Sequence, residues 1–238
     1  MKTLSVLIPA YNEEATIRSV LDKLAALTSD SAILHGLAME IVVVNDGSTD
    51  STEAEVESFK KDNQDIILKY LAKPNGGKGS AIRMAIAEAS GDIMVVQDAD
   101  MEYDPKDFSL MLPYILDQEY SVVYGSRFLN YQNKHSYKSF YLGGQLVSKV
   151  ANILFGLHLT DEPTCYKMFT REVISRIDLK CTGFEFCPEF TAKAARLGYS
   201  IIEVPIHYYP RSIAEGKKIS WKDGVIAVWT LVKYRIAK

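Results

Sequence analysis

Short apolar runs alternate with longer amphipathic patterns along the first half of the chain, and this alternation restricts the possible folds more than any other feature. Apolar runs bounded by turn residues are typical of buried strands, and apolar residues three and four apart are typical of helices. The pattern predicts an α/β fold whose mostly parallel sheet is flanked by helices. We expect strands near residues 4–8, 40–44, 66–71, 92–97 and 121–124, and helices near 14–27, 51–61, 79–89 and 106–118.

The size and charge of the chain favour a compact single domain. It has 238 residues, of which 47% are hydrophobic, so it can bury a substantial core. The formal net charge of -3 argues against a nucleic-acid-binding protein. The charge is uneven, because residues 211–238 contain seven Lys or Arg and two acidic residues. We expect this basic end to face phosphates.

The spacing of the cysteines indicates a reducing compartment. The three cysteines fit neither a zinc-site spacing nor a paired framework, and we expect them to be buried small side chains: Cys165, Cys181 and Cys187. The chain enters its first strand without a signal-peptide pattern, and no later stretch reaches transmembrane length. We therefore expect a cytoplasmic protein that is soluble or peripheral to a membrane.

An acidic pair, Asp98 and Asp100, follows the apolar run 93–96. Open α/β sheets bind ligands at the carboxyl ends of their strands. Two like charges buried there need compensation, and a divalent cation shared with a diphosphate supplies it, since Mg²⁺ and Mn²⁺ favour hard oxygen ligands. The sequence therefore predicts metal-assisted chemistry on a nucleotide-activated substrate.

Three other polar turns follow the early strands. In the first, Tyr11 is placed to stack on a base while Glu13 accepts a hydrogen bond. In the second, Asp46 is placed to hold a base or ribose, and in the glycine-rich third, Lys78 is placed to meet a phosphate. Each turn alone is common, so their order carries the interpretation. Dinucleotide-binding and P-loop motifs are missing, which argues against a dehydrogenase or a P-loop NTPase.

These motifs resemble the GT-A glycosyltransferases of family 2, through Pro9-Ala-Tyr-Asn-Glu13, Asn45-Asp-Gly-Ser48 and Asp98-Ala-Asp100. Nearly the whole chain is similar to polyprenyl-phosphate sugar transferases of the dolichol-phosphate mannose synthase type. That likeness is carried by Gly125-Ser126-Arg127, by Gly183-Phe184-Glu185-Phe186 with Glu189, and by Val204-Pro205-Ile206 followed by Arg211 and Lys217. The resemblance implies one GT-A domain over 1–238, with a nucleotide-sugar half (1–124) and an acceptor half with amphipathic helices (125–238).

The resemblance also implies roles for individual residues. The nucleoside pocket would contain Pro9, Tyr11, Glu13, Val44 and Asp46. The ribose, diphosphate and a Mg²⁺ or Mn²⁺ ion would contact Asp98, Ala99 and Asp100, with Glu102 as a further metal ligand where many of these enzymes have Gln. The leaving diphosphate would be held by Arg211 and Lys217, and the acceptor phosphate by Arg127. Of these groups, we expect Asp100, Arg127, Arg211 and Lys217 to act in catalysis.

Several assignments leave a simpler alternative open. The family's acceptor-side stretch is altered here over residues 161–167, and Asp161 is expected either to shape the donor pocket or to stabilise a local turn. Glu189 belongs either to the site or to the first turn of a helix, where the helix dipole favours a carboxylate. Lys217 either contacts diphosphate or is a solvated surface lysine.

The acceptor half also carries features that favour a membrane surface. Residues 127–149 contain four Lys or Arg, no acidic residue and several aromatic residues. The stretches 146–155 and 221–234 are amphipathic, with basic residues close to the second, so they suit either interfacial helices or ordinary packed helices. We expect a peripheral protein, and a membrane-protein partner is an alternative anchor.

Together these features favour an inverting transfer of one sugar from a nucleotide sugar to a polyprenyl phosphate. An anionic phosphate needs no general base, so the site has mainly to orient it and to stabilise the departing diphosphate. The donor stays open between GDP-mannose, UDP-glucose and a UDP-N-acetylhexosamine. A family 2 enzyme with a saccharide or protein acceptor is an alternative. A noncatalytic nucleotide-sugar-binding protein and a nucleotidyltransferase are alternatives of other classes.

Overall fold

Within the described residues, seven strands form one sheet in the order β3-β2-β1-β4-β6-β5-β7. The structure is a computed structural model that describes residues 2–28, 30–134, 137–212 and 218–237. Neighbouring strands are parallel except that β6 is antiparallel to both β4 and β5. The predicted α/β fold with a mostly parallel sheet is confirmed. The strands are β1 (Thr3–Ala10), β2 (Ala38–Asn45), β3 (Ile67–Ala72), β4 (Ile93–Val96), β5 (Val122–Ser126), β6 (Lys167–Thr170) and β7 (Ile201–Pro205).

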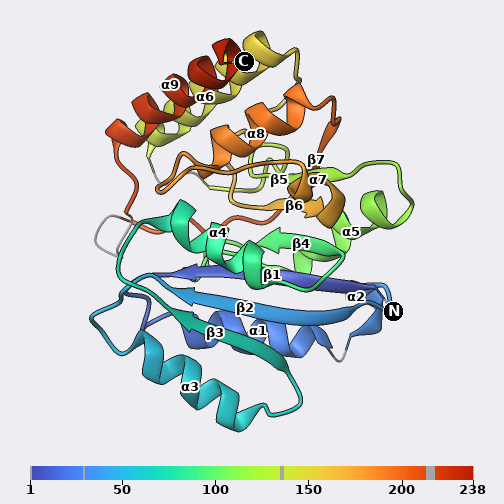
Figure 1. Ribbon diagram of the computed structural model, residues 1–238, viewed down its shortest axis with the longest axis vertical. Helices are drawn as coiled ribbons and strands as arrows, with labels where there is room; N and C mark the ends of the chain where they lie inside the picture. Colours follow the sequence, from blue (N-terminus) through green and yellow to red (C-terminus); the bar gives the residue numbers. More distant parts are fainter. Residues whose placement is uncertain (1, 29, 135–136, 213–217, 238) are drawn as a thin grey trace.

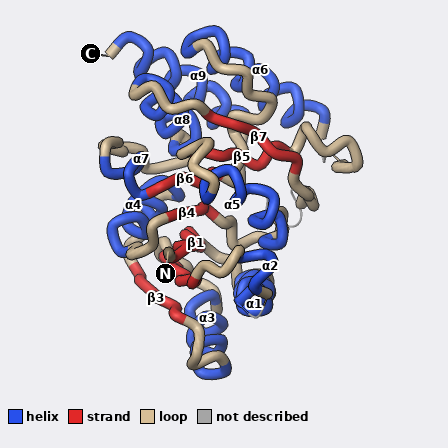
Figure 2. The backbone as a smooth tube through the Cα atoms, turned by 90° about the vertical axis from the view of Figure 1, so that its right-hand side faces the viewer, coloured by secondary structure: helices blue, strands red, loops and turns tan. Residues whose placement is uncertain are grey.

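Helices cover both faces of the sheet. Figure 2 shows α1, α2 and α5 on one side of the strands and α4 and α7 on the other. The long helices α6 and α9 lie side by side at one end of the molecule, outside α8, and far from α3 (Figure 1). The helices are α1 (Ile17–Thr28), α2 (Ser31–Leu34), α3 (Thr52–Asp62), α4 (Lys78–Glu88), the 3-10 helix η1 (Pro105–Asp107), α5 (Phe108–Leu116), α6 (Lys138–Phe155), α7 (Arg171–Ser175), α8 (Phe186–Arg196) and α9 (Trp221–Ile236).

All nine elements expected in the first half are present, with ends shifted by a few residues. The antiparallel strand β6 is an addition that the alternation did not predict. It is short, and it pairs with β4 on one side and β5 on the other. Its insertion separates β4 from β5, so the strand that leads to Asp98 and the strand that leads to Arg127 are not direct neighbours.

Two hydrophobic clusters hold these layers together. The larger one is built on the central strands, where residues 4–8 of β1 and 93–96 of β4 are almost fully buried. The smaller one joins α6, α8 and α9 through Val147, Ala151, Ala192, Ala227 and Leu231. The three cysteines are free and buried, as expected. In the described part of the chain, no helix combines the length and apolar character needed to cross a bilayer.

A buried carboxylate ties three strands together at the edge opposite the predicted site. Glu40 of β2 is 2% exposed and accepts hydrogen bonds from Ser5 of β1 (2.5 Å) and from the backbone N–H of Ser90 (2.5 Å) and Gly91 (3.0 Å) before β4. The Nζ of Lys69 in β3 lies 3.1 Å from the Oε2 of Glu40. Burial opposes the charge, but the hydrogen bonds from Ser5 and Ser90 outweigh it and lower the pKa of Glu40 to about 2.

Candidate active site

The polar turns predicted to form a site do lie at one edge of the sheet, beyond the carboxyl ends of β1, β2, β3 and β4. Pro9 and Val44 are register partners at the ends of β1 and β2. Tyr11 follows β1 and is 37% exposed. Ala99 is buried between the two carboxylates that follow β4. The parallel arrangement of these strands therefore assembles four separate turns into one surface.

The Asp46 carboxylate organises the glycine-rich turn before α4. It is 3% exposed, and it accepts hydrogen bonds from the backbone N–H of Gly76 (2.9 Å) and Gly77 (2.7 Å). Lys73 donates a further bond of 2.5 Å. Gly77 has a φ of 90°, and a Cβ there would clash with the carbonyl of Thr182, so the turn requires glycine. Asp46, which the sequence assigned to a base or ribose, is thus engaged with the protein backbone here.

Lys78 begins α4 and pairs with Asp98 across the site. Its Nζ lies 2.5 Å from Asp98 Oδ1 and 3.7 Å from the Cys165 Sγ. Burial opposes both charges, but their mutual attraction outweighs it, which raises the pKa of Lys78 and lowers the pKa of Asp98. Lys78 therefore stays charged beside the acidic pair, in a place where it can also meet a diphosphate.

Arg211 bridges the second carboxylate of the pair to the first turn. Its Nη2 lies 2.6 Å from Asp100 Oδ2, and its Nη1 lies 3.2 Å from Glu13 Oε2. Burial raises the pKa of Asp100 to about 7, and repulsion from Asp98 and Glu102 adds to the effect, while Arg211 partly offsets it. The charge of Asp100 is therefore only partly compensated, even with Arg211 in place.

Lys218 is a site residue that the sequence analysis passed over in favour of its neighbour. Its Nζ lies 2.7 Å from Glu13 Oε1, donates to the carbonyl of Tyr11 and is 5.5 Å from the centre of the Tyr11 ring. Lys217, which the family's spacing from Arg211 selected, lies outside the described residues. The adjacent pair Lys217–Lys218 was the available signal in the sequence.

Glu102 connects the acidic pair to the segment that follows β7. It is 8% exposed, its Oε1 accepts from the backbone N–H of Arg211 (2.7 Å), and its Oε2 accepts from the Tyr208 hydroxyl (3.2 Å). The backbone carbonyl of Glu102 also accepts from the N–H of Tyr209 (2.9 Å). The residue predicted as a third metal ligand therefore positions Arg211 in this structure.

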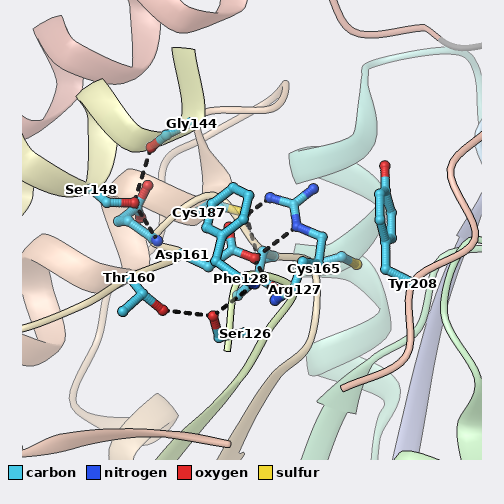
Figure 3. A network of polar contacts seen from close by, with 12 residues as sticks. Ser126, Arg127, Phe128, Gly144, Ser148, Thr160, Asp161, Cys165, Cys187 and Tyr208 are labelled. Carbon is cyan, nitrogen blue, oxygen red and sulfur yellow. Dashed lines mark hydrogen bonds and ion pairs between the residues drawn. The ribbon is translucent and has the colours of Figure 1, made fainter. Parts of the chain in front are cut away.

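Arg127 lies at the end of β5 in a bidentate ion pair with Asp161 (Figure 3). Its Nε and Nη2 donate to the two carboxylate oxygens at 2.7 and 2.6 Å, and its backbone N–H donates to the same group at 2.9 Å. The guanidinium lies 5.3 Å from the centre of the Tyr208 ring and 5.7 Å from that of Phe128. Burial opposes the charge, but Asp161 keeps the pKa of Arg127 well above its ordinary value.

Asp161 is therefore a positioning group for Arg127. It is fully buried, and its own backbone N–H donates to Glu203 Oε1 at 2.8 Å. Glu203 also accepts from the N–H and hydroxyl of Thr160. These bonds hold the Asp161 backbone in place, and the three bonds that its carboxylate accepts from Arg127 leave it poorly suited to act as a general base.

Thr164 and Cys165, from the altered stretch 161–167, lie between the Arg127 side and the Lys78 side of the site, and we call them the floor of the site. The Thr164 hydroxyl donates to the carbonyl of Gly125 (2.6 Å), and Cys165 lies against Lys78. Lys167, at the position of the family's arginine, is fully buried, with its Nζ 3.5 Å from the centre of the Tyr124 ring and bonded to the carbonyl of Glu162. Lys167 is therefore held inside the protein by Tyr124 and Glu162.

Glu189 holds elements together. It is 1% exposed, accepts from the backbone N–H of Lys180 (2.9 Å) and Cys181 (2.6 Å), and pairs with Lys193 (2.5 Å) and the Tyr234 hydroxyl (2.7 Å). Glu189 was expected to belong either to the site or to the first turn of a helix. The contacts favour a structural role, and they join α8 to α9 through Tyr234.

The donor set fits a divalent metal that arrives with a diphosphate. Asp98 and Asp100 present carboxylates at the same edge, and Mg²⁺ is commonly held by one or two carboxylates together with substrate phosphates and water. Across the described residues, no group of three or more His, Cys, Asp or Glu side chains is arranged to hold a metal ion alone. Asp98 and Asp100 are the residues that would hold it.

A family model described as Glycosyl transferase family 2 matches residues 5–178. The chain belongs to glycosyltransferase family 2. This glycosyltransferase is 32% identical over 242 residues to a dolichyl-phosphate beta-glucosyltransferase of Trichomonas vaginalis, covering 98% of the chain and 73% of that protein. It is 31% identical over 227 residues to a dolichyl-phosphate beta-glucosyltransferase of Dictyostelium discoideum, covering 86% of the chain and 66% of that protein.

Another relative of this glycosyltransferase is a low-salt glycan biosynthesis hexosyltransferase of Haloferax volcanii, 29% identical over 98% of the chain but only 53% of that protein. The chain thus spans from about half to about three quarters of these three relatives. Among solved structures, glucosyl-3-phosphoglycerate synthase of Mycobacterium tuberculosis, in complex with Mn²⁺, UDP and phosphoglyceric acid, matches with a TM-score of 0.72 and 22% identity. That match covers 100% of this chain and 80% of the other, and it confirms the GT-A-type fold.

Proposed function

We propose that this family 2 glycosyltransferase moves one sugar from a nucleotide sugar to a polyprenyl phosphate, with inversion at the anomeric carbon. The observation that carries the proposal is the Arg127–Asp161 pair, which presents a fixed guanidinium on the acceptor side of the site. A phosphate acceptor is anionic near neutral pH, so it needs a cation to orient it rather than a base to deprotonate it. The names of the relatives support the same acceptor class.

The donor end supplies what the leaving group needs. Asp98 and Asp100 would hold Mg²⁺ or Mn²⁺, which when bound neutralises charge on the departing nucleoside diphosphate. Lys78, Arg211 and Lys218 supply further positive charge at the same edge, and we assign Lys217 the same task. Pro9, Tyr11, Glu13 and Val44 line the side on which we place the nucleoside. The attacking phosphate oxygen then displaces the nucleotide in a single step, without a covalent enzyme intermediate.

Transfer of radiolabel tests the reaction. UDP-glucose, GDP-mannose and UDP-N-acetylglucosamine are supplied separately with polyprenyl phosphates and Mg²⁺ or Mn²⁺, and label is measured in the lipid fraction. We expect label from UDP-glucose, because two relatives are named glucosyltransferases. Label should disappear with EDTA and in Asp100→Asn.

Three results would overturn this proposal. Label that enters a saccharide or a protein, and never lipid, would establish the alternative acceptor class. Tight binding of a nucleotide sugar without transfer to any acceptor would indicate a noncatalytic binding protein. Release of pyrophosphate from a nucleoside triphosphate would instead indicate a nucleotidyltransferase.

We further propose that the chain works peripherally at the cytoplasmic face of a membrane, through an apolar surface on α6 and α9. One side of each helix packs in the smaller hydrophobic cluster. The other side is exposed, with Trp221 at 75% and Trp229 at 65%. We call this surface the α6–α9 face. Its exposed apolar residues are Leu142, Leu146 and Ile153 on α6, and Trp221, Val225, Trp229 and Ile236 on α9.

The charge around the α6–α9 face favours anionic lipid as its partner. The sequence of α6 contains no acidic residue, and the acidic residue of α9, Asp223, caps its own helix by accepting from Ser220. Basic residues Lys222 and Lys233 share the exposed surface of α9. Tryptophan beside lysine suits the boundary between headgroups and acyl chains. α6 begins beside the acceptor site, because Tyr141 packs on Phe128 next to Arg127.

A further inference from the structure

The site's own cations occupy the carboxylates that a metal would use. Arg211 Nη2 lies 2.6 Å from Asp100 Oδ2, and Lys78 Nζ lies 2.5 Å from Asp98 Oδ1. The other Asp100 oxygen accepts from the backbone N–H of Glu102 at 3.1 Å. A metal ion that reaches Asp100 therefore meets a carboxylate whose oxygens both have protein partners.

Arg211 and a divalent cation compete for the same oxygen. A Mg²⁺ ion sits about 2.1 Å from a carboxylate ligand. A guanidinium nitrogen 2.6 Å from that oxygen would then lie next to a double positive charge in a largely buried site, where screening is weak. Either Arg211 moves off Asp100 or the metal binds poorly.

A nucleoside diphosphate relieves this competition. Its oxygens offer Arg211 a second, more strongly charged partner, and guanidinium pairs with phosphate in a bidentate geometry. If Arg211 turned to the diphosphate, Asp100 would become available to hold a metal ion. Arg211 would exchange Asp100 for the diphosphate, and Asp100 would exchange Arg211 for the metal ion. Neither buried charge would be left without a partner.

We infer that Arg211 couples the binding of metal and nucleotide: it suppresses metal binding in the absence of nucleotide, and it strengthens nucleotide binding once it is released. The inference rests on the proposed function for its nucleotide, because only a nucleoside diphosphate group brings the competing phosphates. It assigns Arg211 two opposite effects on two ligands, which a purely structural residue would not have. Coupling between two ligands is reciprocal, so either can be measured.

Lys218 provides a matched control. It is also a cation of the site, but it pairs with Glu13 (2.7 Å) and the Tyr11 carbonyl rather than with Asp100. Replacing it removes one positive charge from the same surface without freeing the metal carboxylate. A general change in electrostatic potential would affect both variants alike, whereas the competition at Asp100 predicts a difference between them.

The test is a titration of the purified full chain with Mn²⁺ alone at alkaline pH, with free Mn²⁺ followed by electron paramagnetic resonance. We expect Arg211→Met to bind Mn²⁺ more tightly than the unmodified protein, on the order of tenfold. Lys218→Met should stay within about twofold of the unmodified protein, a difference small beside typical coupling factors. In a second titration, UDP or GDP in the presence of Mn²⁺ should bind Arg211→Met more weakly.

Equal or weaker Mn²⁺ binding by Arg211→Met in the absence of nucleotide would overturn the inference, and so would an equal gain in both variants. Circular dichroism checks the fold, and Arg211→Gln repeats the titration if the methionine variant unfolds. Because the first titration contains no sugar, lipid or nucleotide, its outcome is separate from the transfer assay. The transfer assay can fail while Arg211→Met still binds Mn²⁺ more tightly and nucleotide more weakly. In that case the coupling by Arg211 stands, and only the proposed polyprenyl phosphate acceptor is rejected.

Discussion

At the scale of single residues, Arg127 is the group on which the acceptor class depends. It is held by three hydrogen bonds to Asp161, at the end of β5, away from the nucleoside side. We expect Arg127→Ala to lower kcat/KM for polyprenyl phosphate by about a hundredfold, the loss of a charge-assisted bidentate contact, while nucleotide affinity stays unchanged. Transfer kinetics and nucleotide titration measure the two effects. An equal loss of nucleotide affinity would show that Arg127 acts at the donor site instead. The control is Arg176→Ala, at an exposed arginine.

Asp46 shows how a motif residue can act through the backbone. Its carboxylate accepts from the N–H groups of Gly76 and Gly77, and an amide at this position would turn a donor toward one of them. We expect Asp46→Asn to lower the free energy of unfolding by about 1–3 kcal/mol, the cost of an unsatisfied buried group. It should also weaken nucleotide binding, because the turn holds Lys78. Urea denaturation checks the first effect, with the exposed Asp65→Asn expected to behave like the unmodified protein.

At the scale of elements, the Glu40 cluster makes the packing of β1, β2 and β4 sensitive to acid. The pKa of Glu40 is about 2 in the folded chain, below its ordinary 4.5. A lowered pKa contributes stability above the unfolded value and loses it as the pH falls toward the folded value. The cluster therefore stabilises the sheet above about pH 5, and its contribution, on the order of 3 kcal/mol, should disappear between about pH 5 and 2.

Glu40→Gln tests this element directly. At neutral pH we expect a lower free energy of unfolding than in the unmodified protein, because the amide cannot accept all the bonds from Ser5, Ser90 and Gly91. The difference between the two proteins should shrink as the pH falls, which denaturant titrations at several pH values would show. A difference that is constant with pH would argue against the charged form, and Glu88→Gln on the exposed end of α4 is the control.

At the scale of the whole molecule, the α6–α9 face predicts binding to anionic membranes. Replacing Trp221 and Trp229 by Ser should reduce cosedimentation with vesicles of phosphatidylcholine and phosphatidylglycerol by about tenfold or more, because two large apolar side chains no longer leave water. Binding should also fall as salt rises. Ile67→Ser, an exposed apolar residue on β3, should have no effect. Undiminished binding by the double variant would favour another anchor, such as a membrane-protein partner.

Much of the fold follows from the sequence because each early strand is an apolar run between recognisable turns. The strand order does not follow, because β6 joins the sheet through pairing with β4 and β5 that no local pattern contains. In the site, residue types at strand ends predicted which turns meet, but not their partners. Asp46 is bound by glycine N–H groups 30 residues away, and Glu102 by Tyr208 and Arg211, which lie more than 100 residues away. Such contacts depend on tertiary geometry.

The insertion of β6 between β4 and β5 separates the donor carboxylates from Arg127. Adjacent strands lie about 4.8 Å apart, so the ends of β4 and β5 are separated by about 10 Å, with the floor of Thr164 and Cys165 between them. The donor carboxylates stand at one side of this interval and Arg127 at the other. The interval suits a single sugar ring between leaving group and nucleophile. We therefore expect the sugar to pass directly from the diphosphate to the phosphate held at Arg127, without moving between the two sides of the site.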